Sequence, residues 1–185
     1  MKKNNQKNII KSKTGKIIFL DFDGVVNTPG IYSLYEKRKG KKVIECRYAW
    51  PQDGFVNNLE AVYLLNTLYD VIHYEIVITS TWREHERSHT AEECLRNSGL
   101  DKKIKVIGKL DKGINRSALI NKWIEDNKFT GDYLIFDDED FYTEKGYYRP
   151  KNYKEMSKKF IKIKHSDGIT LSNVREAINR FKNNE

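Results

Sequence analysis

Residues 16–27, with the sequence KIIFLDFDGVVN, constrain the fold of this chain more than any other stretch. The stretch opens with apolar β-branched and aromatic residues, which is typical of a strand buried on both faces of a parallel sheet. Asp21 and Asp23 follow, and Gly24 then allows the backbone to turn sharply. Carboxylates at the carboxyl end of a parallel strand lie where open α/β sheets bind ligands. The sequence therefore predicts an acidic functional site at the end of this first strand.

Three interpretations of this acidic pair compete. Asp and Gly are ordinary turn residues, so the pair can simply form a turn. A calcium loop counted from Asp21 requires Gly at position six and Glu at position twelve, but Val26 and Tyr32 stand there. In the third interpretation, Asp21 attacks a phosphorus atom, and Asp23 gives a proton to the leaving group and then takes one from water. This third interpretation requires a hydroxyl, a cation and further carboxylates elsewhere in the chain.

The composition fits a single intracellular domain. A chain of 185 residues, 38% of them hydrophobic, is long enough for one domain with a real core. The two cysteines lack metal-type spacing, and no apolar run approaches the length of a membrane span. The N-terminus carries lysines but lacks the apolar core of a signal peptide, so we expect a cytoplasmic protein without a membrane partner. No feature of the sequence indicates an oligomeric state.

The chain is basic, with a formal net charge of +8. This charge favours polyanionic partners such as nucleic acid, although abundant Lys and Asn can equally reflect the base composition of a genome. Residues 1–15 are polar and lysine-rich, and we interpret them as a disordered basic arm able to touch nucleic acid. We expect the folded domain to cover residues 16–185.

Apolar runs and helical repeats alternate along the rest of the chain. The expected strands cover residues 16–21, 74–79, 104–107, 133–136 and 160–163, and the expected helices cover residues 55–69, 84–98, 111 or 113 to 127, and 170–181. This alternation is typical of an α/β fold with a Rossmann-like, doubly wound parallel sheet. The carboxyl ends of parallel strands share one edge of the sheet, so polar clusters at those ends converge there.

The segment from about residue 28 to residue 54 lacks a helical pattern. Ile31–Tyr35 and Val43–Tyr48 are short expected strands, and the basic turn Glu36–Lys42 lies between them. We therefore expect a small β-hairpin cap inserted directly after the acidic motif. The basic turn is either a solvated hairpin tip or a contact for a phosphate backbone.

Hydroxyl groups follow the second expected strand. Ser80, with Thr79 and Thr81 beside it, can hydrogen-bond a phosphate oxygen or cap the next helix. All three hydroxyls are candidates for the phosphate contact. Arg83 can add a bidentate phosphate contact or lie on the surface.

A cation and two more carboxylates complete the set. Lys112, near the start of the helix before the fourth strand, can neutralise charge on a phosphoryl group. Arg116, one turn later, is the alternative, because single lysines carry little information in a lysine-rich chain. Asp137 and Asp138 end the fourth strand in a run of four acidic residues that repel one another without a cation. Because Mg²⁺ prefers carboxylate oxygens, we interpret this run as part of a magnesium site rather than a solvated turn.

The order of these motifs resembles the haloacid dehalogenase (HAD) superfamily of phosphotransferases, over residues 16–181. Within that superfamily, the chain resembles a subgroup found in RNA-repair proteins. The matching pieces are DFDGV at 21–25, STWR at 80–83, KG at 112–113, WI at 123–124, LIFDD at 134–138 and GIT at 168–170. The resemblance implies the HAD fold and a phosphatase that uses Mg²⁺.

The resemblance also implies a role for each matched residue. Asp21 is the nucleophile that becomes phosphorylated, and Asp23 is the general acid and base. The phosphoryl group is held by Ser80 and Lys112. The implied ligands of Mg²⁺ are Asp21, the backbone carbonyl of Asp23, and Asp138 with Asp137 nearby.

We therefore expect a Mg²⁺-dependent phosphomonoester hydrolase that acts on a terminal phosphate of nucleic acid, with a 3′-phosphate as the favoured substrate. A small cap leaves the site open to a bulky polynucleotide end. One alternative is a phosphatase of free nucleotides or other small metabolites. Another is a non-catalytic nucleic-acid-binding protein on a HAD scaffold, against which the intact pair Asp21 and Asp23 argues.

Overall fold

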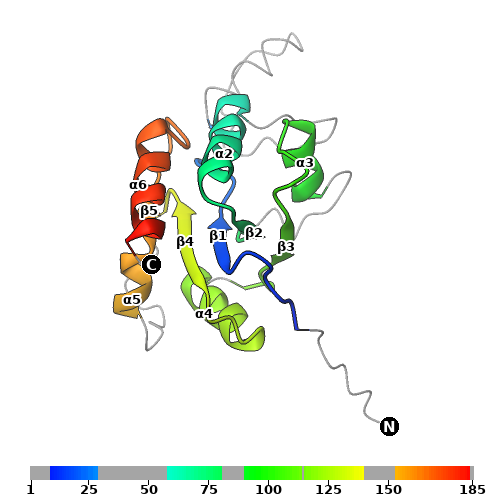
Figure 1. Ribbon diagram of the computed structural model, residues 1–185, viewed down its shortest axis with the longest axis vertical. Coiled ribbons are helices and arrows are strands. Elements are labelled where there is room, and N and C mark those ends of the chain that lie inside the picture. The colour runs from blue at the N-terminus through cyan, green and yellow to red at the C-terminus, as the bar shows by residue number, and fades with distance from the viewer. Residues whose placement is uncertain (1–8, 29–57, 81–89, 114, 140–152, 184–185) are drawn as a thin grey trace.

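The computed structural model describes residues 9–28, 58–80, 90–113, 115–139 and 153–183. Within these residues, five parallel strands form one sheet in the order β3-β2-β1-β4-β5 (Figure 1). The strands are β1 (Lys16–Leu20), β2 (Glu75–Ile78), β3 (Val106–Lys109), β4 (Asp132–Asp137) and β5 (Phe160–Lys162). The helices are α2 (Leu59–Val71), α3 (Ala91–Asn97), α4 (Arg116–Asp126), α5 (Tyr153–Lys158) and α6 (Leu171–Lys182). The predicted α/β parallel sheet is confirmed.

Helices cover both faces of the sheet, as the doubly wound fold requires. Alternate strand residues point to opposite faces. Ile18 and Leu20 of β1 therefore join one apolar cluster with α2, α3 and α6. Ile17 and Phe19 join a second cluster with α4 and α5 (Figure 1). Because β1 is buried on both faces, it is apolar throughout after Lys16, which is why it could be predicted as a central strand.

The register of the central strands fixes which polar residues meet. Leu20 lies opposite Ile78 of β2 and Phe136 of β4. One residue further along, the N–H of Asp21 donates to the carbonyl of Phe136 (3.0 Å), and the N–H of Thr79 donates to the carbonyl of Leu20 (2.9 Å). The polar ends of β1, β2 and β4 therefore lie side by side at the carboxyl edge of the sheet.

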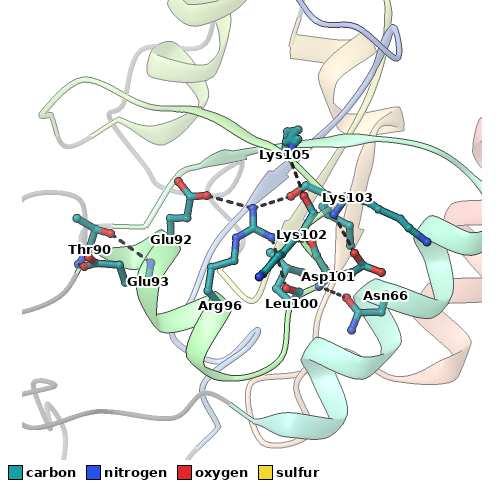
Figure 2. Close-up of polar contacts among 11 residues, drawn as sticks. Asn66, Thr90, Glu92, Glu93, Arg96, Leu100, Asp101, Lys102, Lys103 and Lys105 are labelled. Atoms are coloured by element: carbon teal, nitrogen blue, oxygen red, sulfur yellow. Dashed lines mark hydrogen bonds and ion pairs between the residues drawn. The ribbon is translucent and has the colours of Figure 1, made fainter.

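The third strand begins at Val106 rather than at residue 104 as predicted. The guanidinium of Arg96 at the end of α3 donates to the carbonyls of Asp101 (2.6 Å) and Ile104 (2.7 Å) and pairs with Glu92 (Figure 2). These contacts hold the connection in a turn, so the carbonyls of Asp101 and Ile104 bond to Arg96 instead of extending the strand. Local β propensity could not reveal this constraint, because it comes from a side chain of the preceding helix.

Capping residues set the helix starts later than the apolar periodicity predicts. Asn58, Thr90 and Asn115 are the N-caps of α2, α3 and α4, and their side chains accept hydrogen bonds from N–H groups of the first turn. The helix predicted from residue 84 therefore begins at Ala91. Helix α5 was not predicted, because Met156 is the one buried apolar residue described in this short polar segment and gives no periodicity.

Residues 9–15 of the expected basic arm are described by the structure and contact the folded domain. The Ser12 hydroxyl (2.6 Å) and the Lys13 N–H (2.9 Å) donate to the carboxylate of Glu75, and the Ile10 N–H donates to the side chain of Asn127 (2.9 Å). Glu75 is buried in β2, so these donors replace the hydrogen bonds to water that its carboxylate has lost. Residues 1–8 lie outside the described part of the chain.

The predicted β-hairpin cap, at about residues 28–54, also lies outside the described residues apart from Thr28, and it stays a prediction. Among the helices that the structure describes, none is long and apolar enough to cross a membrane.

Candidate active site

A tight turn follows β1 and carries the acidic motif. The carbonyl of Phe22 accepts hydrogen bonds from the N–H groups of Val25 (3.0 Å), Val26 (2.9 Å) and Asn27 (2.8 Å). The N–H of Gly24 donates to the carbonyl of Asn27 (2.6 Å), and Gly24 has a φ of +74°. The chain therefore doubles back immediately after Asp23, and Asp21 stays at the edge of the sheet.

Three carboxylates converge at this edge. Carboxylate oxygens of Asp21, Asp137 and Asp138 lie within 4.8 Å of one another. Asp21 and Asp137 are buried because they extend adjacent central strands, whereas Asp138 is partly buried. The structure therefore brings together the two acidic segments that the sequence analysis placed at the ends of the first and fourth strands.

Arg116 is the cation that the structure places against these carboxylates. It is the first residue of α4, and this helix begins at the carboxyl edge because it follows β3. Its Nη1 lies 3.1 Å from Oδ2 of Asp21 and also pairs with Oδ2 of Asp137. One guanidinium thus bridges the ends of β1 and β4.

Burial and ion pairing act in opposite directions on the acidic groups. Burial raises the pKa of Asp21 well above its ordinary value, and Arg116 partly opposes this shift. Burial also raises the pKa of Asp137, to about 6, again against the effect of Arg116. The pKa of Arg116 is raised by the two carboxylates beyond its already high ordinary value, although its own burial acts against this. The site therefore holds more negative charge than Arg116 alone offsets.

The other predicted site residues lie at different places. Asp23 is partly buried and is not one of the three clustered carboxylates. Thr79 and Ser80 are both buried directly after β2, level with Asp21 and Phe22 in the register. Lys112 is exposed and forms no ion pair with any residue of the described ranges. Thr81 and Arg83 lie outside those ranges.

One residue that touches the cluster was not predicted. Nδ1 of His165 lies 2.5 Å from Oδ2 of Asp138. His165 belongs to the turn after β5, and the carboxyl end of β5 lies at the same edge of the sheet as the ends of β1 and β4. Applying the rule of convergent strand ends to the fifth strand would have drawn attention to residues 164–168.

Gly24 is required by the space around it as well as by its backbone conformation. A Cβ atom at this position would lie 2.5 Å from Cγ of Asp138 and would overlap Nδ1 of His165. We therefore predict that Gly24→Ala loses more free energy of unfolding than the roughly 1–2 kcal/mol that a left-handed conformation costs a non-glycine residue. The variant should also lose activity, because Asp138 must move. Urea denaturation and a phosphatase assay measure both effects.

Gly15 provides a matched control for this substitution. Its φ is +70°, close to that of Gly24, but a Cβ atom at Gly15 meets no atom within 4 Å. Gly15→Ala should therefore carry the backbone cost alone and retain activity. Equal destabilisation by the two substitutions would contradict the role of Gly24 in making room for Asp138.

The raised pKa of Asp137 predicts how stability changes with pH in the absence of a divalent cation. The unfolded carboxyl ionises near its ordinary value of 3.8, and the folded one ionises near 6. Between these values the folded state holds a proton that the unfolded state lacks, so stability falls as pH rises. Asp137→Asn removes this effect. In EDTA at pH 7 we expect the variant to be more stable than wild type by up to about 3 kcal/mol, and to be equal near pH 4.

Denaturation curves at several pH values, with EDTA or with Mg²⁺, measure this difference. With Mg²⁺ at pH 7, wild type should be more stable than Asp137→Asn, because Mg²⁺ that binds only the folded state stabilises wild type by mass action. If wild type and Asp137→Asn have the same free energy of unfolding in EDTA at pH 7, Arg116 fully compensates the buried carboxylate.

The residues present fit a divalent cation. Three ionised carboxylates and one guanidinium leave two negative charges uncompensated among these four side chains. The donors are hard carboxylate oxygens, which suit Mg²⁺. Burial raises the pKa of Asp137, so its ionised form is disfavoured, and a cation beside it would stabilise that form. Asp21, Asp137 and Asp138 are the residues able to hold the ion.

A doubly wound parallel sheet with clustered aspartates at its carboxyl edge is an arrangement that supports phosphoryl transfer. The chain matches, over residues 17–174, the family described as the HAD domain in Swiss Army Knife RNA repair proteins. Because this match covers most of the chain, the protein belongs to that family of HAD domains. Among curated proteins and solved structures, no match to the chain is found. The family membership indicates phosphatase chemistry.

Proposed function

We propose that the protein is a Mg²⁺-dependent phosphomonoester hydrolase that removes a terminal phosphate, in the first instance a 3′-phosphate, from nucleic acid. The observation that carries the proposal is the convergence of Asp21, Asp137, Asp138 and Arg116 at one edge of the sheet. A bound Mg²⁺ would supply the positive charge that screens the carboxylates from the incoming phosphate. Family membership supports the reaction type.

In the proposed reaction, Asp21 is the nucleophile. A carboxylate oxygen of Asp21 bonds to phosphorus as the bond from phosphorus to the leaving oxygen breaks, and Asp23 gives the leaving oxygen a proton. Water then attacks the phosphorylated Asp21 and loses a proton to Asp23. This step releases inorganic phosphate and restores both carboxyl groups. The location of Asp21 at the strand end and of Asp23 directly before the Gly24 turn supports this division of roles.

Arg116 has two roles in the proposed reaction. Its guanidinium lies 3.1 Å from Asp21, so it favours the ionised and nucleophilic form of a carboxyl whose pKa is raised by burial. The same group is placed to stabilise negative charge on the transferring phosphoryl oxygens. Ser80, buried at the end of β2, is proposed to donate a hydrogen bond to the phosphoryl group, with Thr79 as the alternative.

Exposed lysines at both ends of the catalytic edge support a polyanionic substrate. Lys109 ends the edge strand β3, Lys112 follows it, and Lys162 ends the opposite edge strand β5. We call these three residues the edge lysines. They lie on either side of the central strands that carry Asp21 and Asp137, where they can neutralise backbone phosphates away from the chemistry. The RNA-repair context of the family favours a nucleic acid end over a small metabolite.

A phosphate-release assay with Mg²⁺ tests the proposed function. The substrates are oligonucleotides with a 3′-phosphate or a 5′-phosphate, the matching mononucleotides and a small generic phosphomonoester. We expect kcat/KM to be highest for the 3′-phosphorylated oligonucleotide and to fall steeply as salt rises, because binding releases condensed cations. Equal kcat/KM for oligonucleotide and mononucleotide, insensitive to salt, would instead support a phosphatase of free nucleotides. Binding without turnover would support a non-catalytic role.

Replacing the edge lysines with Ala should raise KM for the oligonucleotide and leave kcat nearly unchanged, because these contacts are equal in the ground and transition states. A matched control is the triple substitution of Lys102, Lys103 and Lys105. These three exposed lysines precede β3 and therefore lie at the amino end of the strands, away from the catalytic edge (Figure 2). Their replacement removes the same charge without changing the catalytic edge. Equal increases in KM for the two variants would argue against a substrate path along the edge lysines.

A further inference from the structure

His165 contacts one of the clustered carboxylates from a turn outside the acidic motifs. Its Nδ1 lies 2.5 Å from Oδ2 of Asp138. An ionised carboxylate only accepts hydrogen bonds, so Nδ1 is the ring nitrogen that carries the proton and donates. The contact therefore acts on a carboxylate whose oxygen lies within 4.8 Å of oxygens of Asp21 and Asp137.

The turn that carries His165 is fixed at both of its ends. Before it, the N–H of Ile163 donates to the carbonyl of Asp137 (2.9 Å). Within it, the N–H groups of Asp167 (2.9 Å) and Gly168 (3.0 Å) donate to the carbonyl of Lys164. The first bond ties the start of the turn to β4, and the other two close the turn around the ring.

The far end of the turn is tied to the acidic motif itself. Gly168 has a φ of +68°, and a Cβ atom there would lie 2.8 Å from the carbonyl oxygen of Val25. The next N–H, that of Ile169, donates to the same carbonyl (3.0 Å). The position of His165 is therefore set by the loops after β1 and β4, which are the loops that carry Asp21 and Asp138.

The carboxylate of Asp138 needs a partner to fix its orientation. The terminal torsion of an Asp side chain is broad and does not by itself select one orientation. Gly24 leaves the adjacent space open, so Nδ1 of His165 and the carboxylate of Asp138 occupy the volume that a Cβ atom would take. The hydrogen bond from His165 supplies such a restraint. Hydrogen bonds of this kind to ligating carboxylates typically contribute 10–100-fold to metal affinity or activity.

We infer that His165 is a positioning residue that orients Asp138 for a divalent cation, and this inference rests on the cation site of the proposed function. The His165 side chain is 62% exposed, so its contact with Asp138 contributes little to folding stability. Its effect should therefore appear in cation binding rather than in the free energy of unfolding. This difference separates a positioning role from a merely structural one.

Calorimetric titration with Mg²⁺ alone, on the full chain without substrate, tests this inference. His165→Ala should raise the Kd for Mg²⁺ by about 10–100-fold. His165→Asn should retain most of the affinity for Mg²⁺. The side-chain nitrogen of Asn, like Nδ1 of His, is bonded to Cγ, so it can donate a hydrogen bond from nearly the same place. Urea denaturation in EDTA should give nearly the same stability for all three proteins. Lys164→Ala, a substitution in the same turn at a residue paired with Asp167, should leave the Kd unchanged.

Asp138→Asn separates failure of this inference from failure of the cation site. If Asp138→Asn weakens binding and His165→Ala does not, the positioning role is overturned and the cation site stands. If Asp138→Asn binds Mg²⁺ like wild type, the cation site is overturned, and the role of His165 falls with it. Weakening in both variants, with recovery in His165→Asn, supports the inference.

Discussion

Asp21→Asn is expected to abolish phosphate release, by a factor on the order of 10⁴–10⁶, as for the loss of a catalytic nucleophile in other enzymes. The substitution replaces an attacking oxygen of a buried carboxylate at the end of β1 with an amide nitrogen and changes little volume. The fold should persist, because the contact of Asp21 with the sheet is made by its backbone N–H to Phe136. Initial rates with the best substrate, and circular dichroism of both proteins, measure the two outcomes.

Two further variants make this result specific. Asp23→Asn should slow turnover by about 10²–10⁴-fold, the range for a lost general acid and base. Because Asp23 is also proposed to activate the water that cleaves the intermediate, this variant should accumulate phosphorylated Asp21, which mass spectrometry after acid quenching can detect. Asp70→Asn is a matched control at an exposed carboxylate of α2 and should be fully active. Near-normal turnover in Asp21→Asn would rule out the covalent mechanism.

Arg116→Ala is expected to lower kcat/KM for a small phosphomonoester by about 10²–10³-fold, the usual effect of removing one group that stabilises transition-state charge. It should also destabilise the metal-free protein at pH 8 by about 3–5 kcal/mol, because the ion pairs with Asp21 and Asp137 are lost while the carboxylates stay buried. This loss of stability should be smaller at pH 5. Without Arg116 the pKa values of both carboxyls rise further, so they become neutral at low pH and no longer need a partner.

Lys112→Ala is the informative comparison for Arg116→Ala. Lys112 is the residue that the resemblance to the HAD superfamily indicates, but it is exposed, whereas Arg116 contacts the carboxylates. With a small phosphomonoester, Lys112→Ala should retain activity close to wild type. Arg116→Lys should recover only part of the activity, because an ammonium group cannot bridge two carboxylates with the planar geometry of a guanidinium. A larger loss from Lys112→Ala than from Arg116→Ala would return the catalytic role to Lys112.

The sequence by itself determined the layout of the fold and the acidic core of the site. The apolar run before Asp21 and the one before Asp137 are long enough, and apolar enough, to be buried on both faces of a sheet. Such burial is typical of strands in a parallel sheet, and the carboxyl ends of parallel strands share an edge. The convergence of the two acidic segments therefore followed from local patterns alone, and it is found in the structure.

The tertiary structure alone decided which side chains reach the carboxylates. Whether Lys112 or Arg116 meets Asp21 depends on where α4 begins, and Asn115 sets that start by capping the helix. The contact of His165 with Asp138 depends on the turn after β5 being tied to Val25, 140 residues before His165. Contacts of this kind join segments far apart in the chain, and their geometry arises only when the sheet has assembled. A pattern within one segment carries no information about them.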